Sequence, residues 1–300
     1  MLAAERQFHR PGDSTLLAFV GLAYALTWIL LAPWFYAFNV VYHEEIPGWM
    51  WAFAPLAFIG GWGPSVAGLI VSLRTGGRDA VRLLARSLLA WRQPWRWYLM
   101  TFALPPLLTA AALLIVDRGT VTLRQFDGGA AAANLPLAYA LALPFGPMGE
   151  ELGWRGVALP RLLSSFGPVK ASLLLGGIWT FWHVPMMLWS PGASLPSFMG
   201  LSVASVVIYL IQLTAETALM TLLFLRTNGS VFMAILAHLT LNTSEAVLFG
   251  GLPPQPAEHL HRIYIVNVAL LAGLGVISLA MFPSRSNGRL SAPEEKHHAR

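Results

Sequence analysis

Three short segments of this sequence contain residue types that activate water for hydrolysis. The first contains Glu150 and Glu151, the second ends at His183, and the third contains His238 and Asn242. A carboxylate beside a histidine can take a proton from water as a general base. A second histidine and an amide can donate hydrogen bonds to a developing oxyanion. The residue types therefore predict acyl transfer to water, as in a peptidase or amidase.

The spacing within each segment pairs the side chains. Three pairs are separated by four residues: Glu151 with Arg155, Trp179 with His183, and His238 with Asn242. Residues four apart share one face of a helix, whereas Glu150 points about 100° away from Glu151 and can face a cavity. The paired charges of Glu151 and Arg155 favour a structural role that locks their helix.

Hydrolysis can also use a zinc ion or a serine or cysteine nucleophile. Glu150, His183 and His238 are also a zinc ligand set, although the chain has no HExxH motif. The sequence has no GxSxG motif and no cysteine, which disfavours serine catalysis and excludes a cysteine nucleophile. We therefore expect no cofactor, with a zinc-dependent mechanism as the alternative.

The composition places these residues in a membrane protein. Hydrophobic residues make up 56% of the 300 residues and charged residues 11%, against about 25% charged residues in a soluble domain. A spanning helix needs roughly 20 apolar residues. Eight segments qualify: 15–38, 50–73, 97–116, 135–163, 168–189, 200–225, 230–248 and 263–282. We predict an all-α polytopic protein with about eight transmembrane helices, kinked in the fourth at Pro144 and Pro147.

The distribution of basic residues predicts the orientation. Fifteen lysines and arginines fall on one side of the eight spans, and three on the other. Basic loops stay in the cytoplasm, so both termini are expected on the cytoplasmic side. The protein itself is expected in the inner membrane of a bacterium. We expect a cytoplasmic segment over 1–14, one transmembrane domain over 15–283 with its catalytic core at about 140–245, and a disordered tail over 284–300. The net charge of +5 fits membrane lipids as partners, and we expect no nucleic acid.

The same basic residues serve as depth markers. Glu150 lies 11 residues before Arg161, His183 lies 13 after Lys170, and His238 lies 12 after Arg226. At 1.5 Å per residue, each lies roughly 16–20 Å from its marker, close to the middle of the membrane. Glu216 reaches a similar depth 10 residues before Arg226. We expect it to make a structural hydrogen bond beside the site.

Residues 78–96 form a basic amphipathic pattern. Arg78, Arg82 and Arg86 repeat every four residues, so they share one helical face. Leu84, Leu88, Leu89, Trp91 and Trp95 supply an apolar complement. This pattern is typical of a helix that lies in the cytoplasmic leaflet, and a solvated loop helix is the alternative.

The three motifs resemble those of the CPBP family, which includes type II CAAX prenyl endopeptidases and bacteriocin-processing or immunity (Abi) proteins. The family pattern is EExxxR, F/WxxxH and HxxxN on separate transmembrane helices. Here it reads Glu150-Glu151 to Arg155, Trp179 to His183, and His238 to Asn242, with tryptophan where phenylalanine is common. The resemblance covers about residues 140–245 and implies an eight-helix intramembrane endopeptidase. It also implies that Glu150 and His183 activate water and that His238 and Asn242 form the oxyanion hole.

The substrate expected from this resemblance is a peptide or a lipidated protein. Two other functions are compatible with charged residues at mid-membrane depth: a transporter, and a noncatalytic scaffold or immunity protein with the same fold. The sequence contains no related halves that would favour transport, and its intact motifs argue against a scaffold.

Overall fold

The computed structural model describes residues 14–36, 48–49, 54–118, 127–188, 201–250 and 256–282, and this part of the chain contains helices but no strand. The elements follow one another along the chain as α2 (Ser14–Tyr36), α3 (Ala54–Gly61), α4 (Gly63–Leu88), α5 (Trp95–Asp117), α7 (Gly128–Phe145), α8 (Pro147–Gly153), the π-helical turn η3 (Trp154–Ala158), α9 (Leu159–His183), the 3₁₀ helix η4 (Val184–Leu188), α10 (Val203–Arg226), α11 (Val231–Gly250) and α12 (Ala257–Ala280). The predicted all-α class is confirmed. The predicted terminal segments lie outside the described residues, apart from Ser14.

Several helices have the length and composition of membrane spans. Within the described residues, five runs qualify: Ser14–Pro33, Trp95–Asp117, Pro147–Met187, Val203–Arg226 and Glu258–Ala280. Their outer faces carry exposed apolar side chains such as Leu17, Ile29 and Leu107. Water would disfavour such faces, whereas lipid tails match them. The chain is therefore a multi-pass membrane protein, and the count of eight spans and the cytoplasmic termini stay predictions.

Two glycines mark the predicted interruptions of the fourth span and of its connection to the fifth. The predicted fourth span, 135–163, is broken at Gly146, between the end of α7 and Pro147 at the start of α8. This confirms the expected kink, because a proline begins a helix readily but interrupts one. The predicted break between the fourth and fifth spans is confirmed at Gly167, where φ is +72° and ψ is 173°, so the two parts of α9 meet at a sharp kink. Only glycine adopts this backbone conformation at little cost.

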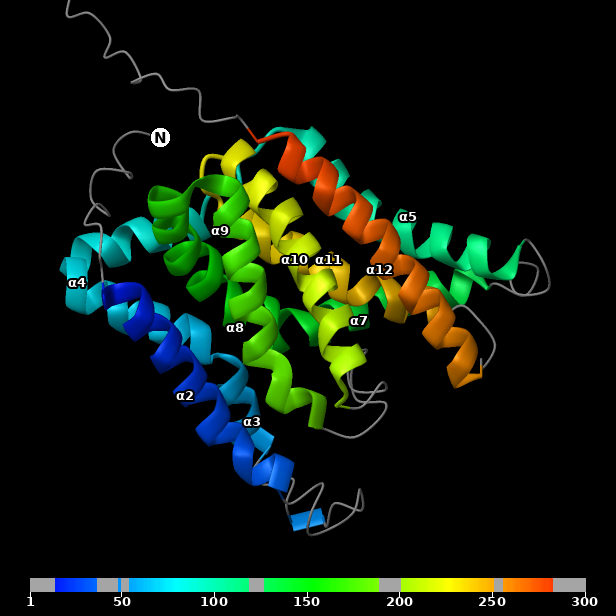
Figure 1. The fold of residues 1–300 in the computed structure, drawn as a ribbon, viewed down its shortest axis with the longest axis horizontal. Coiled ribbons are helices and arrows are strands. Elements are labelled where there is room, and N and C mark those ends of the chain that lie inside the picture. Colours follow the sequence, from blue (N-terminus) through cyan, green and yellow to red (C-terminus); the bar gives the residue numbers. More distant parts are fainter. Residues whose placement is uncertain are drawn as a thin grey trace, which may run out of the picture.

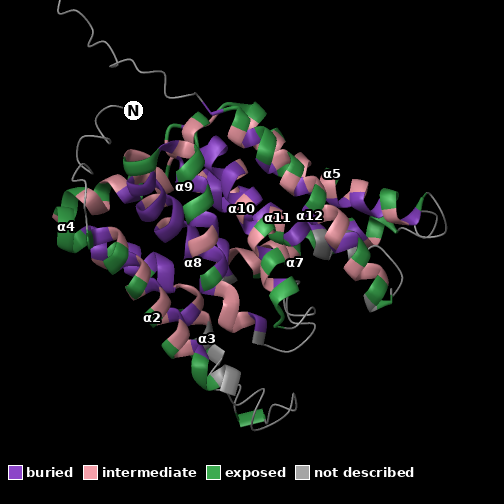
Figure 2. Ribbon diagram, in the orientation of Figure 1, coloured by how far each residue is buried: buried purple, intermediate pink, exposed green. Residues whose placement is uncertain are grey.

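Helices α8 to α11 form the centre of the molecule. Helix α10 packs against α9 and α12, helix α11 packs against α5 and α7, and α8 packs against α4 and α11. In Figure 1, α2 and α12 lie on opposite flanks of this group. Figure 2 shows that buried residues gather where the central helices meet, with more exposed residues on the outer ones. The three motif segments lie on α8, α9 and α11, so the buried centre is where they meet.

One of the basic depth markers does not reach the surface. Lys170 and Arg226 are exposed, but Arg161 is buried and donates a 2.8 Å hydrogen bond from Nη1 to the carbonyl of Val157. Arginine can stay inside a helical bundle when backbone carbonyls accept its hydrogen bonds. Arg161 is thus enclosed by protein while Lys170 and Arg226 reach the surface, and the use of all three as cytoplasmic depth markers stays a prediction.

Candidate active site

Helix α8 is held close to its neighbours by residues that lack side chains. A Cβ atom on Gly153 would lie 2.2 Å from the carbonyl oxygen of Pro64, and one on Gly149 would lie 2.8 Å from that of Gly61. The Ser65 hydroxyl also donates a 3.0 Å hydrogen bond to the carbonyl of Met148. Close approach of this kind is how small residues bring helices together in membranes. It fixes the part of the backbone that carries both glutamates.

Trp179 connects Glu150 with His183. The Trp179 indole donates a 2.6 Å hydrogen bond from Nε1 to Oε2 of Glu150. Its backbone carbonyl accepts a 2.9 Å hydrogen bond from Nδ1 of His183, four residues later. One residue thus orients both members of the predicted general-base pair, and Glu150 lies within electrostatic range of the His183 ring.

The hydrogen bond of His183 sets its tautomer. A carbonyl oxygen only accepts, so Nδ1 must carry the proton and Nε2 of the neutral ring has a free lone pair. The ring packs edge-to-face against Trp182 and Tyr209, with centroids 4.6 and 5.3 Å away. Helix α2 holds the end of α9 as well, since Tyr24 and Trp28 donate hydrogen bonds to the carbonyls of Ile178 and Trp182. Aromatic side chains and the hydrogen bond of Nδ1 therefore fix the orientation of the His183 ring and of its acceptor nitrogen, Nε2.

Glu151 joins the first and third motifs. Its Oε1 accepts 2.8 Å hydrogen bonds from Nη1 of Arg155 and from Nδ1 of His238. All three side chains are buried. Arg155 lies in the π-helical turn η3, with its guanidinium carbon 4.3 Å from the Trp179 ring centroid and its Nη2 3.4 Å from the Thr217 hydroxyl. The predicted contact of Glu151 with Arg155 is therefore present, and it extends to His238.

Asn242 and Glu150 face a common gap over Gly146. A Cβ on Gly146 would lie 3.5 Å from Nδ2 of Asn242 and 3.6 Å from Oε1 of Glu150. The missing side chain leaves room between an amide donor and a carboxylate acceptor. Asn242 is also exposed, unlike His238 one turn earlier. An amide donor and a carboxylate acceptor therefore lie near one another at the position of Gly146.

Glu216 belongs to a separate buried chain of hydrogen bonds. Tyr264 on α12 donates a 2.5 Å hydrogen bond to Oε1 of Gln212, whose Nε2 donates a 2.9 Å bond to Oε1 of Glu216. Glu216 lies within electrostatic range of His238 and Arg155, as expected from its depth. The sequence pattern did not single out Gln212 or Tyr264. Sequence spacing could have predicted the contact of Gln212 with Glu216, because Gln212 lies four residues earlier on the same helix. It could not have predicted Tyr264, which lies on another helix.

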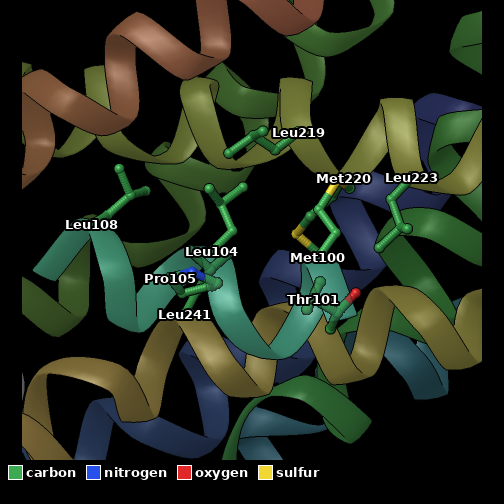
Figure 3. Close-up of a pocket in the computed structure, with 10 residues that line it drawn as sticks. Met100, Thr101, Leu104, Pro105, Leu108, Leu219, Met220, Leu223 and Leu241 are labelled. Atoms are coloured by element: carbon green, nitrogen blue, oxygen red, sulfur yellow. The ribbon is translucent and has the colours of Figure 1, made fainter. Parts of the chain in front are cut away.

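An apolar cavity lies on the neighbouring face of α11. Its walls come from α5, α10 and α11 and include Met100, Met220, Ala237 and Leu241 (Figure 3). Ala237 and Leu241 directly precede His238 and Asn242, so the cavity and the polar cluster lie on adjacent faces of one helix. The cavity lining contains no titratable side chain. The candidate active site is therefore the polar cluster, not this cavity.

The zinc alternative requires Glu150, His183 and His238 to converge on one point. Among the residues that the structure describes, no three histidine, aspartate or glutamate side chains gather closely enough to hold a metal ion. Oε2 of Glu150 accepts a hydrogen bond from Trp179, and Nδ1 of His183 and of His238 are hydrogen-bonded to the Trp179 carbonyl and to Glu151. In this arrangement the three predicted ligands do not gather into a metal site, and the expected absence of a cofactor stays a prediction.

The fold and the cluster define a polytopic helical membrane protein with a buried glutamate–histidine site. Residues 132–244 match the family described as type II CAAX prenyl endopeptidase Rce1-like. The chain is also 28% identical over 153 residues to CAAX prenyl protease 2 of Methanococcus maripaludis, an alignment that covers 50% of this chain and 55% of that relative. These findings confirm the predicted resemblance to the CPBP family over this core segment. All three motifs lie inside the matched segment, and their catalytic roles stay predictions.

Proposed function

We propose that this protein is an intramembrane endopeptidase that hydrolyses a peptide bond near the membrane with water activated by Glu150 and His183. The observation that carries the proposal is the double contact of Trp179, which binds the Glu150 carboxylate with its side chain and the His183 ring with its carbonyl. A carboxylate and an imidazole oriented by one residue are a preorganised general base. The Rce1-like match over residues 132–244 supports the same reaction class.

The reaction would proceed by addition and elimination. A water bound between Glu150 and Nε2 of His183 loses a proton to this pair as its oxygen attacks the scissile carbonyl carbon. The carbonyl oxygen becomes an oxyanion, which Asn242 and His238 stabilise by hydrogen bonding. The C–N bond then breaks, and the leaving amine takes up the proton that the pair had removed from water.

Glu151 and Arg155 would support the oxyanion side. His238 donates its Nδ1 proton to Glu151, so its Nε2 can donate to the oxyanion only when the ring is an imidazolium. Two glutamates, one arginine and a charged His238 together have no net charge, which is the least costly state for a buried ionic cluster. The Glu151 carboxylate is thus proposed to keep His238 in its donating form.

The substrate is proposed to be a peptide or lipidated protein that reaches the site from the cytoplasmic side or from the bilayer. The relative from Methanococcus maripaludis is named CAAX prenyl protease 2, and the apolar outer faces of the helices suit a substrate that is partly in lipid. A bacterial inner membrane is the proposed location. A bilayer-embedded enzyme meets lipid-attached peptides at high local concentration, which favours this class over freely soluble proteins.

The test is cleavage of a fluorogenic peptide and lipopeptide panel by purified protein in detergent. Wild type is compared with Glu150→Gln, His183→Ala and, as a matched histidine control outside the cluster, His261→Ala, each with and without a chelator. We expect chelator-resistant cleavage that only the first two substitutions abolish. Loss on chelation with recovery on added zinc would replace the mechanism with a metal-dependent one. Cleavage unchanged by Glu150→Gln and His183→Ala would overturn the assigned site.

A further inference from the structure

A strongly basic surface lies at the corner between α4 and α5. Residues 74–99 contain six arginines, all exposed: Arg74, Arg78, Arg82, Arg86, Arg92 and Arg96. The one acidic residue in this stretch is Asp79, which pairs with Arg82 at 2.8 Å. Both partners of this pair are exposed, so it neutralises little of the surrounding potential. The corner, called here the Arg74–Leu99 corner, keeps a local charge excess that the proposed catalysis does not use.

The backbone turns the arginine row away from the protein. Helix α4 is kinked at Gly77, where φ is +59°, so residues 78–88 take a new direction at the end visible on the left in Figure 1. Leu84 is buried, and its Cδ1 lies 2.5 Å from where a Cβ on Gly156 would be. Leu88 also packs on the main core. The predicted apolar complement was therefore wrong for Leu84 and Leu88, which face the protein and hold the opposite, basic face outward.

Exposed aromatic and aliphatic side chains lie beside the arginines. Leu89, Trp91, Trp95 and Leu99 are 71%, 54%, 74% and 56% exposed. The Arg92 guanidinium carbon lies 5.2 Å from the Trp91 ring centroid. Tryptophans with arginines in this arrangement are typical of the headgroup layer, where the indole meets the acyl boundary and the guanidinium meets phosphate. Water alone would give these four apolar side chains no favourable partner.

The corner is attached to the helix that carries the third motif. The Ser230 hydroxyl donates a 2.8 Å hydrogen bond to the carbonyl of Ala90 and accepts one of 3.1 Å from the backbone N–H of Met233. Ser230 therefore caps α11 and ties it to the corner in one place. The corner consequently lies at the same end of the molecule as Arg226 on the preceding turn, the end that the basic residues predict to be cytoplasmic.

We propose that the Arg74–Leu99 corner binds the phosphate groups of anionic membrane lipids. Arginine forks match phosphate oxygens in geometry and charge, and the neighbouring indoles and leucines contact the upper acyl chain. A zwitterionic lipid presents a phosphate together with a compensating cation, so it gains less from a row of arginines. The corner therefore prefers anionic over zwitterionic lipid, independently of the peptide substrate.

The experiment titrates detergent-purified protein with dioleoylphosphatidylglycerol or dioleoylphosphatidylcholine and counts bound lipid by native mass spectrometry. The test variant is Arg78→Gln/Arg82→Gln/Arg86→Gln. The matched control, Lys170→Gln/Arg226→Gln/Arg262→Gln, removes three exposed positive charges elsewhere. We expect wild type and the control to prefer the anionic lipid and the test variant to bind it roughly tenfold more weakly or worse. Raised salt should reduce the wild-type preference.

Three results would overturn the proposal. They are equal wild-type binding of the two lipids, unchanged anionic-lipid binding by the test variant, and equal losses in the test and control variants. A surface that instead binds an added polyglutamate peptide more tightly than the anionic lipid would be a site for acidic peptides, which also overturns it. Because the three arginines are exposed, the unfolding temperature in lipid-free detergent should match wild type, which shows that any loss is local.

Discussion

Oε1 of Glu151 on α8 lies 2.8 Å from Nδ1 of His238 on α11, and the same oxygen accepts the hydrogen bond of Arg155. One carboxylate oxygen thus holds two motifs together inside a region that excludes water. The fully buried guanidinium stacks on Trp179, which belongs to the remaining motif. The site is therefore assembled around a shared charge, and its stability and its chemistry depend on the same contacts.

Replacing Arg155 should lower the free energy of unfolding. Arg155→Met leaves Glu151 buried with one cationic partner fewer, and breaking a buried ion pair of this kind costs about 3–5 kcal/mol. Thermal unfolding in detergent measures the loss, with Arg226→Met at an exposed position as the control. An unfolding temperature as high as that of the control would mean that Glu151 has no need of this charge.

Part of this site follows directly from sequence spacing. Glu151 and Arg155 are four residues apart on a continuous helical stretch, so their contact required only local geometry. The meeting of the three motifs followed from the depth of Glu150, His183 and His238 below basic residues at the helix ends. The three segments meet although Arg161, the marker used for Glu150, is itself buried.

Other parts of the site depend on contacts between helices that spacing does not determine. The gap over Gly146 exists because α7 ends there and α11 passes with Asn242 beside it. The contact of Gln212 with Tyr264 joins residues 52 positions apart. At the basic corner, Leu84 and Leu88 fitted a lipid-facing stripe equally well, and only the packing of Leu84 beside Gly156 and of Leu88 on the main core shows that they face the protein.

Gly146→Ala should reduce catalysis while the fold persists. The added methyl would lie at ordinary contact distance from Asn242 and Glu150, so it fits, but it fills the gap between them. Displacing a reacting group by about 1 Å can cost roughly 100-fold in rate. We expect kcat to fall by about 10- to 100-fold in the peptide cleavage assay, with an unfolding temperature close to wild type. Gly177→Ala, where an added Cβ meets no atom within 4 Å, is the matched control.

Trp179 should show separable side-chain and backbone roles. Trp179→Phe removes the Nε1 donor to Glu150 but keeps the carbonyl that orients His183. Loss of one hydrogen bond to a charged group is worth about 1.5–3 kcal/mol, so kcat should fall by roughly 10- to 100-fold with little change in KM. Trp179→Ala also removes the ring under Arg155 and beside His238, and it should lower the unfolding temperature as well. Equal activity in wild type and Trp179→Phe would show that the indole does not orient Glu150.

The chain from Tyr264 to Glu216 should connect α12 to the site. Tyr264→Phe leaves Oε1 of Gln212 without its donor, and an unsatisfied buried acceptor costs about 1–3 kcal/mol. We expect a lower unfolding temperature and a modest fall in kcat, because Gln212 then orients Glu216 less firmly. Gln212→Leu should produce a similar fall, and the double variant should lose less than the sum of the two, because the residues act in one chain. Fully additive losses measured by thermal unfolding would show that Tyr264 and Gln212 act independently, which would leave α12 a packing element without a link to Glu216.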